Sequence, residues 1–122
     1  MNVLICKNTE TEGPGTIADF LKEREVPFTV VELSKGEAIP DPAHFDVLVM
    51  LGGPMSANEP HIYPYIAREE ELVRSFVSDG KRVLGVCLGS QIMAKALGAK
   101  VYRGRGTEVG WHDIEITGDG SG

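Results

Sequence analysis

The sequence has no long hydrophobic run and no excess of positive charge. No apolar stretch approaches the ~20 residues that a membrane-spanning helix needs, and an apolar strand pattern begins at Val3 where a signal peptide would lie. Eighteen acidic residues against twelve Lys and Arg give a formal net charge of −6. Phosphate binding requires clustered cations, and Arg103 and Arg105 are interpreted as solvated loop charges. These absences disfavour membranes and nucleic acids as partners.

Cysteine is scarce. The chain has two, Cys6 and Cys87, and neither lies at metal-ligand spacing from another such residue. We therefore expect no metal site, no other cofactor and no structural disulfide, and we predict a reducing, cytoplasmic setting. Cys6 lies inside an apolar run and is predicted to belong to the core.

The hydrophobic pattern alternates between short strands and helices in a chain of 122 residues, enough for one domain. Strands are predicted over residues 3–6, 28–32, 46–51 and 82–86, the last as a buried strand, with further short strands over 100–102 and 111–116. Helices are predicted over 14–24, 64–79 and 90–97, and 34–45 is predicted to be a loop. The residues expected to face the sheet are Ile17, Phe20 and Leu21 in the first helix, Tyr65, Ile66, Leu72, Val73, Phe76 and Val77 in the second, and Ile92, Met93, Ala96 and Leu97 in the third. Such alternation predicts an α/β fold whose parallel sheet is covered on both faces, with ligands bound at the carboxyl ends of the strands.

The segment Gly85-Val86-Cys87-Leu88-Gly89 lies where the strand over 82–86 leads into a helix. A nucleophile between two glycines at such a junction is typical of a nucleophile elbow, in which larger flanking side chains would collide with the strand and the helix. The turn exposes the Cys87 sulfur at a helix N-terminus, where the helix dipole and free N–H groups favour the thiolate. Cys87 is therefore predicted to be a nucleophile.

A second glycine turn, Gly52-Gly53-Pro54, follows the strand over 46–51. Its glycines let the backbone approach a ligand closely. A backbone N–H from this turn, together with that of Leu88, would suffice for an oxyanion hole. An ordinary turn remains the alternative, whereas a P-loop is disfavoured because no Lys-Ser/Thr pair follows.

Four ordered motifs resemble the class I glutamine amidotransferase family, in particular stand-alone domains similar to the amidotransferase part of GMP synthase. They are Gly52-Gly53-Pro54-Met55-Ser56, Gly85-Val86-Cys87-Leu88-Gly89-Ser90-Gln91, Leu97-Gly98-Ala99-Lys100-Val101-Tyr102-Arg103-Gly104 and Glu108-Val109-Gly110-Trp111. The resemblance runs from Asn2 to about Ile116 and implies a flavodoxin-like three-layer sandwich with a mainly parallel sheet.

The resemblance also implies hydrolysis of the glutamine side-chain amide, with the ammonia passed to an acceptor synthetase chain or domain. Cys87 would form a γ-glutamyl thioester, and Gly53 and Leu88 would supply the oxyanion N–H groups. Gln91 and Gly52 would contact the substrate glutamine. From the residues alone, an amide in the first turn of a helix could equally cap the backbone.

The family completes its triad with a His-X-Glu motif downstream of the elbow, and this sequence contains none. After Cys87 the one histidine is His112, predicted to be core-facing or on an edge strand because it alternates in register with Ile114 and Ile116. His44 and His61 are predicted at the surface, with pocket lining by His61 the minor alternative. We therefore expect a single domain over 1–122 that forms the N-terminal two-thirds of an amidotransferase domain, with its C-terminal part missing and a flexible tail over 117–122.

Several functional alternatives stay open on this sequence. Without a base, Cys87 catalysis would be impaired. A cysteine hydrolase of γ-glutamyl peptides would share this layout, and a noncatalytic glutamine-binding or regulatory domain would keep the pocket without the base. A flavin-binding module is disfavoured. An unpaired sheet edge would also favour a homo-oligomer.

Overall fold

The computed structural model describes residues 1–106 and 110–119. Its strands are β1 (Val3–Lys7), β2 (Phe28–Glu32), β3 (Val47–Met50) and β4 (Arg82–Gly85), in the order β2-β1-β3-β4. Every neighbouring pair is parallel, and the register places Val3 opposite both Phe28 and Val47. This order is the one found in flavodoxin-like sheets. The predicted α/β fold with a parallel sheet is confirmed.

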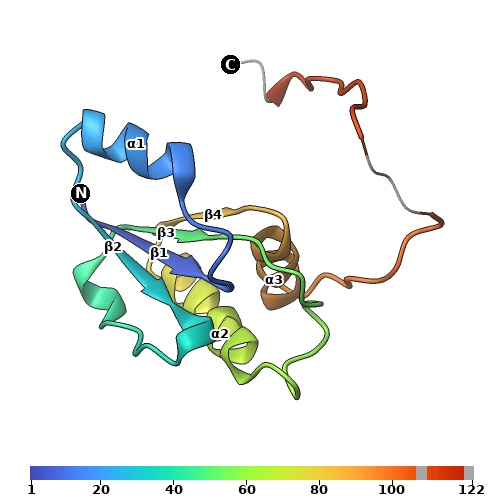
Figure 1. Cartoon of the computed structure of the whole chain (residues 1–122), viewed down its shortest axis with the longest axis horizontal. Coiled ribbons are helices and arrows are strands. Elements are labelled where there is room, and N and C mark those ends of the chain that lie inside the picture. Colours follow the sequence, from blue (N-terminus) through green and yellow to red (C-terminus); the bar gives the residue numbers. More distant parts are fainter. Residues whose placement is uncertain (107–109, 120–122) are drawn as a thin grey trace.

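Three α-helices cover the sheet: α1 (Gly15–Glu23) lies on one face, and α2 (Pro64–Ser78) and α3 (Leu88–Ala96) lie on the other (Figure 1). The predicted loop over 34–45 contains two short 3₁₀ helices at its ends, η1 (Leu33–Lys35) and η2 (Pro42–His44). The parallel sheet is thus covered on both faces, as the alternating pattern predicts.

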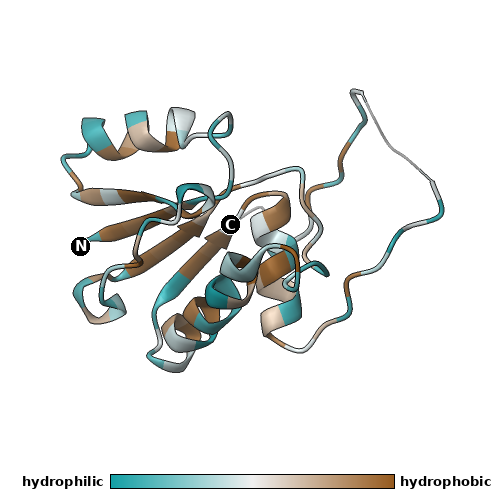
Figure 2. Ribbon diagram, turned by 60° about the horizontal axis from the view of Figure 1, so that its bottom comes forward, coloured by the Kyte–Doolittle hydropathy of each residue, from teal (hydrophilic) through white to brown (hydrophobic). Residues whose placement is uncertain are grey.

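Two hydrophobic clusters hold the layers together, one on each face of the sheet. Alternate side chains of a strand point to opposite faces, so Leu4 and Cys6 belong to the cluster under α2 and α3, while Val3 and Ile5 belong to the cluster under α1. Figure 2 shows the strands as the most hydrophobic part of the ribbon. Cys6 is fully buried, which confirms its predicted place in the core.

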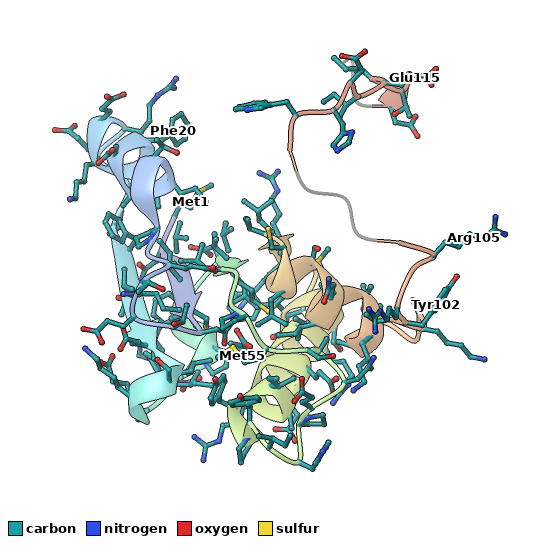
Figure 3. The ribbon with its side chains drawn as sticks, turned by 45° about the vertical axis from the view of Figure 1, so that its right-hand side comes forward. Met1, Phe20, Met55, Tyr102, Arg105 and Glu115 are labelled. Carbon is teal, nitrogen blue, oxygen red and sulfur yellow. The ribbon has the colours of Figure 1, made fainter. Side chains whose placement is uncertain are left out.

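The strand predicted over 82–86 is not buried. Leu84 is 49% exposed. β4 is the edge strand, and α1 packs over β1, β2 and β3 rather than over β4. Phe20 on α1 (Figure 3) is likewise 53% exposed. Ile17, Phe20, Val49 and Leu84 are among the residues that line an apolar groove of about 430 Å³ between α1 and the sheet. Val77 and Leu97, predicted to face the sheet, are also exposed.

The two C-terminal strand predictions, over 100–102 and 111–116, are not met. These residues have no regular secondary structure, and Trp111, Ile114 and Ile116 are exposed. Figure 1 shows the segment leading away from the sheet. Alternation describes which side chains share a face, but a strand also needs a neighbouring edge to pair with. The predicted flexible tail begins in described residues, 117–119, whereas 120–122 lie outside them.

No helix among residues 1–106 and 110–119 has the length and apolarity required to cross a membrane. Within the same residues, no three or more His, Cys, Asp or Glu side chains gather in a group that could hold a metal ion.

Candidate active site

The candidate active site is built around Cys87, which connects β4 to α3. Its backbone has φ 51° and ψ −112°, so it is one of two non-glycine residues with positive φ in the described chain. A side chain in this conformation is strained, and such strain concentrates at functional positions where the surrounding structure enforces it. The Cys87 side chain is exposed, whereas Cys6 is buried, and both are free thiols.

The glycines on either side of Cys87 occupy space that admits no side chain. A Cβ on Gly85 would lie 2.6 Å from the backbone nitrogen of Ser90 and 2.7 Å from the carbonyl oxygen of Gly89. A Cβ on Gly89 would overlap the carbonyl group of Met50. The backbone at the end of β4 therefore lies directly against the first turn of α3. This close approach is what allows the chain to pass so abruptly from the strand into the helix.

Hydrogen bonds fix the turn at both ends. The Val86 N–H donates to the Met50 carbonyl at 2.9 Å, and the Ser90 hydroxyl donates to the Cys87 carbonyl at 2.6 Å. The helix begins at Leu88, two residues earlier than predicted. Among the described residues, no acceptor takes the Leu88 N–H. This donor lies directly after the thiol at the N-terminus of α3.

The Gly52-Gly53 turn lies against the elbow. A Cβ on Gly52 would be 3.4 Å from the Cys87 Cβ, and one on Gly53 would be 3.2 Å from the Leu88 Cδ2. The Gly53 N–H, like that of Leu88, has no acceptor within the part of the chain that the structure describes. The structure thus brings Gly52, Gly53, Cys87 and Leu88 together at the carboxyl ends of β3 and β4.

Gln91 lies one turn further along α3, in a neighbouring hollow. This hollow has a volume of about 330 Å³, and its lining includes Met55, Ser56, Glu59, Gln91 and Tyr102. Figure 3 shows Tyr102 on the segment that follows α3. Cys87 does not line the hollow, so the structure places Gln91 next to the elbow without joining both in one cavity. Of the fourth motif, Glu108 and Val109 lie outside the described residues.

Sequence reasoning missed two acidic residues near the site. The Glu12 carboxylate, from the loop after β1, lies 2.6 Å from the position of a Cβ on Gly52. Glu69 on α2 is fully buried. A signal for Glu69 existed, because its spacing from Ile66 and Val73 places it on the apolar face of the helix. Glu12 could have been added to the predicted site because it lies in the loop after β1, and the loops at the carboxyl ends of parallel strands converge.

Glu69 belongs to a buried polar network. The Asn8 side-chain amide donates to Glu69 Oε1 and to the Leu51 carbonyl, each at 3.1 Å, and Asn8 and Glu69 are both 0% exposed. Burial raises the pKa of Glu69 to about 8, against a smaller lowering from the Asn8 hydrogen bond. Burial, with a smaller contribution from Glu69, raises the pKa of Cys6 to about 12. Cys6 is therefore a protonated core thiol at neutral pH.

The structure supplies no histidine partner for Cys87 from the residues it describes. No side chain there is hydrogen-bonded to the Cys87 sulfur. His44 and His61 are exposed, as predicted. The prediction for His112 is wrong, because it is neither core-facing nor on an edge strand: it is exposed in a segment without a pairing partner.

Comparison with known proteins identifies the family. The family model for "Glutamine amidotransferase class-I" matches residues 15–121. The chain belongs to the class I glutamine amidotransferases. A crystal structure of a glutamine amidotransferase from Thermotoga maritima superposes with a TM-score of 0.90 at 37% identity, covering 98% of this chain and 53% of that one. The flavodoxin-like fold implied by the sequence motifs is thereby confirmed.

Curated relatives of this amidotransferase chain include stand-alone proteins and parts of larger enzymes. The glutamine amidotransferase-like protein YfeJ of Salmonella typhimurium is 32% identical over 121 residues, covering 96% of this chain and 51% of that protein. The GMP synthase (glutamine-hydrolyzing) of Aeropyrum pernix is 35% identical over 91 residues, covering 75% of this chain and 16% of the enzyme. The chain thus spans about half the length of YfeJ and of the Thermotoga structure.

Proposed function

We propose that this chain carries the nucleophile half of a glutamine amidotransferase site, in which Cys87 attacks the side-chain amide of glutamine. The observation that carries the proposal is the convergence of the strained, exposed Cys87 with two backbone N–H groups that lack acceptors, those of Gly53 and Leu88. A nucleophile beside two such donors is the arrangement that acyl transfer requires.

The chemistry follows from these groups. The Cys87 thiolate adds to the amide carbon, and the oxygen of the tetrahedral intermediate accepts hydrogen bonds from Gly53 and Leu88. The carbon–nitrogen bond then breaks, and the nitrogen takes up a proton and leaves as ammonia. Water adds to the resulting γ-glutamyl thioester, which releases glutamate and regenerates the thiol. Proton transfer in both steps needs a general acid–base group, and among the described residues no side chain is hydrogen-bonded to the Cys87 sulfur.

Gln91 and Gly52 are proposed to contact the bound glutamine, since Gly52 lies against Cys87 and Gln91 lines the hollow beside the elbow. The ammonia would pass to an acceptor synthetase. This part of the proposal is supported by the relatives named as glutamine-hydrolyzing GMP synthases, in which the matching segment is a small part of the whole enzyme.

A glutamine analogue that carries a chloroketone in place of the amide tests the proposal, because its carbonyl requires the oxyanion donors and its carbon alkylates the thiol. We expect a single adduct on Cys87, detected by peptide mass spectrometry, and protection by free glutamine. Cys87→Ala should abolish the adduct, and the matched variant Cys6→Ala should leave it intact. Failure of glutamine to protect Cys87 would contradict the proposal. Stronger protection by a γ-glutamyl peptide than by glutamine would instead favour a peptide hydrolase.

A further inference from the structure

We propose that Asn8 and Glu69 form a positioning pair that sets the orientation of the Gly53 N–H at the active site. The inference deepens the proposed function and rests on it. Asn8 follows β1, Glu69 lies on α2, and the carbonyl that Asn8 binds belongs to Leu51 at the end of β3. The pair therefore ties three separate elements to the start of the glycine turn.

The geometry places Asn8 where it controls the turn. The side-chain amide of Asn8 cannot rotate freely, because one N–H donates to the Leu51 carbonyl and the other to Glu69 Oε1. The Leu51 N–H in turn donates to the Cys6 carbonyl at 3.0 Å. Both polar groups of the residue before Gly52 are thus held, and the Asn8 Cβ lies 3.3 Å from the position of a Cβ on Gly53.

A glycine pair needs such an anchor. Two consecutive glycines have more accessible backbone conformations than any other pair, so the direction of the Gly53 N–H is set mainly by what holds the residues around it. An oxyanion donor stabilises the transition state only if it already points at the developing charge. Asn8 holds the Leu51 carbonyl, which precedes the turn, and its Cβ lies beside Gly53.

Glu69 is otherwise hard to explain. It lies among the apolar residues of α2, forms no ion pair among the described residues, and has Asn8 as its one hydrogen-bond partner there. A buried carboxyl group at such a place costs stability compared with an apolar side chain. The compensating gain is orientation: Glu69 Oε1 accepts one amide hydrogen of Asn8 and so directs the other to the Leu51 carbonyl. The Tyr65 hydroxyl also donates to the backbone carbonyl of Asn8, at 3.5 Å.

The test compares two alkylation rates at Cys87. Reaction with the glutamine chloroketone depends on the oxyanion donors, whereas reaction with iodoacetamide depends only on the thiol. Asn8→Leu and Glu69→Met keep the side-chain volume and remove the hydrogen bonds. We expect both to slow the chloroketone reaction by about 10- to 100-fold, the scale of a misplaced catalytic group, and to leave the iodoacetamide rate unchanged. Glu69→Gln retains an acceptor oxygen and should restore the rate, and Glu71→Gln, exposed on the same helix, is the matched control.

An equal fall in both rates, or no fall in either, would overturn the positioning role. A wild-type Cys87 that shows no glutamine protection would instead overturn the proposed function, so the two failures are distinguishable.

A second measurement covers the case in which the apolar variants do not fold. The amide resonance of Gly53 should shift as Glu69 ionises near pH 8 and should stay constant in Glu69→Gln. Cys6 and Tyr65 also face Glu69, and both have raised pKa values. The titration uses a Cys87→Ser background, with Glu12→Gln as a control for the carboxylate beside Gly52. A Gly53 resonance that does not respond to Glu69 would contradict the inference.

Discussion

The carbonyl group of Met50 occupies the space that a Cβ on Gly89 would need. Met50 ends β3 and Gly89 lies in the first turn of α3, so this contact joins the middle of the sheet to the helix that presents Cys87. The same carbonyl accepts the Val86 N–H. Backbone contacts therefore tie the position of the candidate nucleophile directly to the core of the sheet.

Gly89→Ala is expected to destabilise the protein by roughly 1–3 kcal/mol, because the added methyl group can be accommodated only if backbone moves. Urea unfolding measures this cost. Gly13→Ala is the matched control, since a Cβ there would have no neighbour within 4 Å. Equal midpoints for the two variants would mean that the contact between Met50 and Gly89 is not as close as described.

The two cysteines should differ sharply in reactivity. Cys87 is exposed, whereas Cys6 is 0% exposed and burial raises the pKa of its thiol to about 12. Iodoacetamide at neutral pH should therefore modify Cys87 alone in the folded protein and both thiols in urea. Peptide mass spectrometry after each treatment distinguishes the sites. Modification of Cys6 under native conditions would show that the sheet opens far more readily than its packing indicates.

The central part of the fold could be predicted from the sequence because each of its strands is a short apolar run next to a clear helix. The strands at residues 3–7 and 47–50 and the helix at 64–78 follow that pattern closely. The elbow was visible for a related reason: a cysteine between two glycines at a strand-to-helix junction has few other interpretations.

The errors share one physical cause. Periodicity predicts which side chains share a face of a helix or strand, but it does not predict whether another element packs against that face. Leu84 and Phe20 have the right spacing to be buried, but α1 leaves β4 partly uncovered. Ile114 and Ile116 alternate as in a strand and pair with nothing. Glu69 was missed for the converse reason, since its polarity hid its place on a buried helical face.

The partial exposure of β4 gives a further prediction. Leu84→Ala should cost less than about 1 kcal/mol, because the Leu84 side chain is already half in contact with water. Leu48→Ala, the same substitution at a fully buried position on the neighbouring strand, should cost about 2–5 kcal/mol. Urea unfolding of both variants provides the comparison. Similar losses would mean that the groove beside α1 is closed in solution.

The buried carboxyl of Glu69 predicts a pH dependence of stability. Burial raises its pKa in the folded protein from 4.5 to about 8. The folded state therefore holds a proton that the unfolded state releases. The stability due to Glu69 is fully present below about pH 4.5, the pKa in the unfolded state. It falls as the pH rises from about 4.5 towards 8, and it is lost once the pH passes the folded-state pKa near 8.

Glu69→Gln removes this titration while keeping the size of the side chain. Relative to the variant, the wild-type protein should lose on the order of a few kcal/mol of unfolding free energy between pH 5 and pH 8.5. The hydrogen bond from Lys7 lowers the pKa of Glu32, so that group contributes stability that is lost at acidic pH, but it is common to both proteins and cancels. Urea unfolding at three pH values measures the difference. Parallel profiles for the two proteins would show that Glu69 reaches water, which would also remove the main reason to regard its hydrogen bond to Asn8 as a buried anchor.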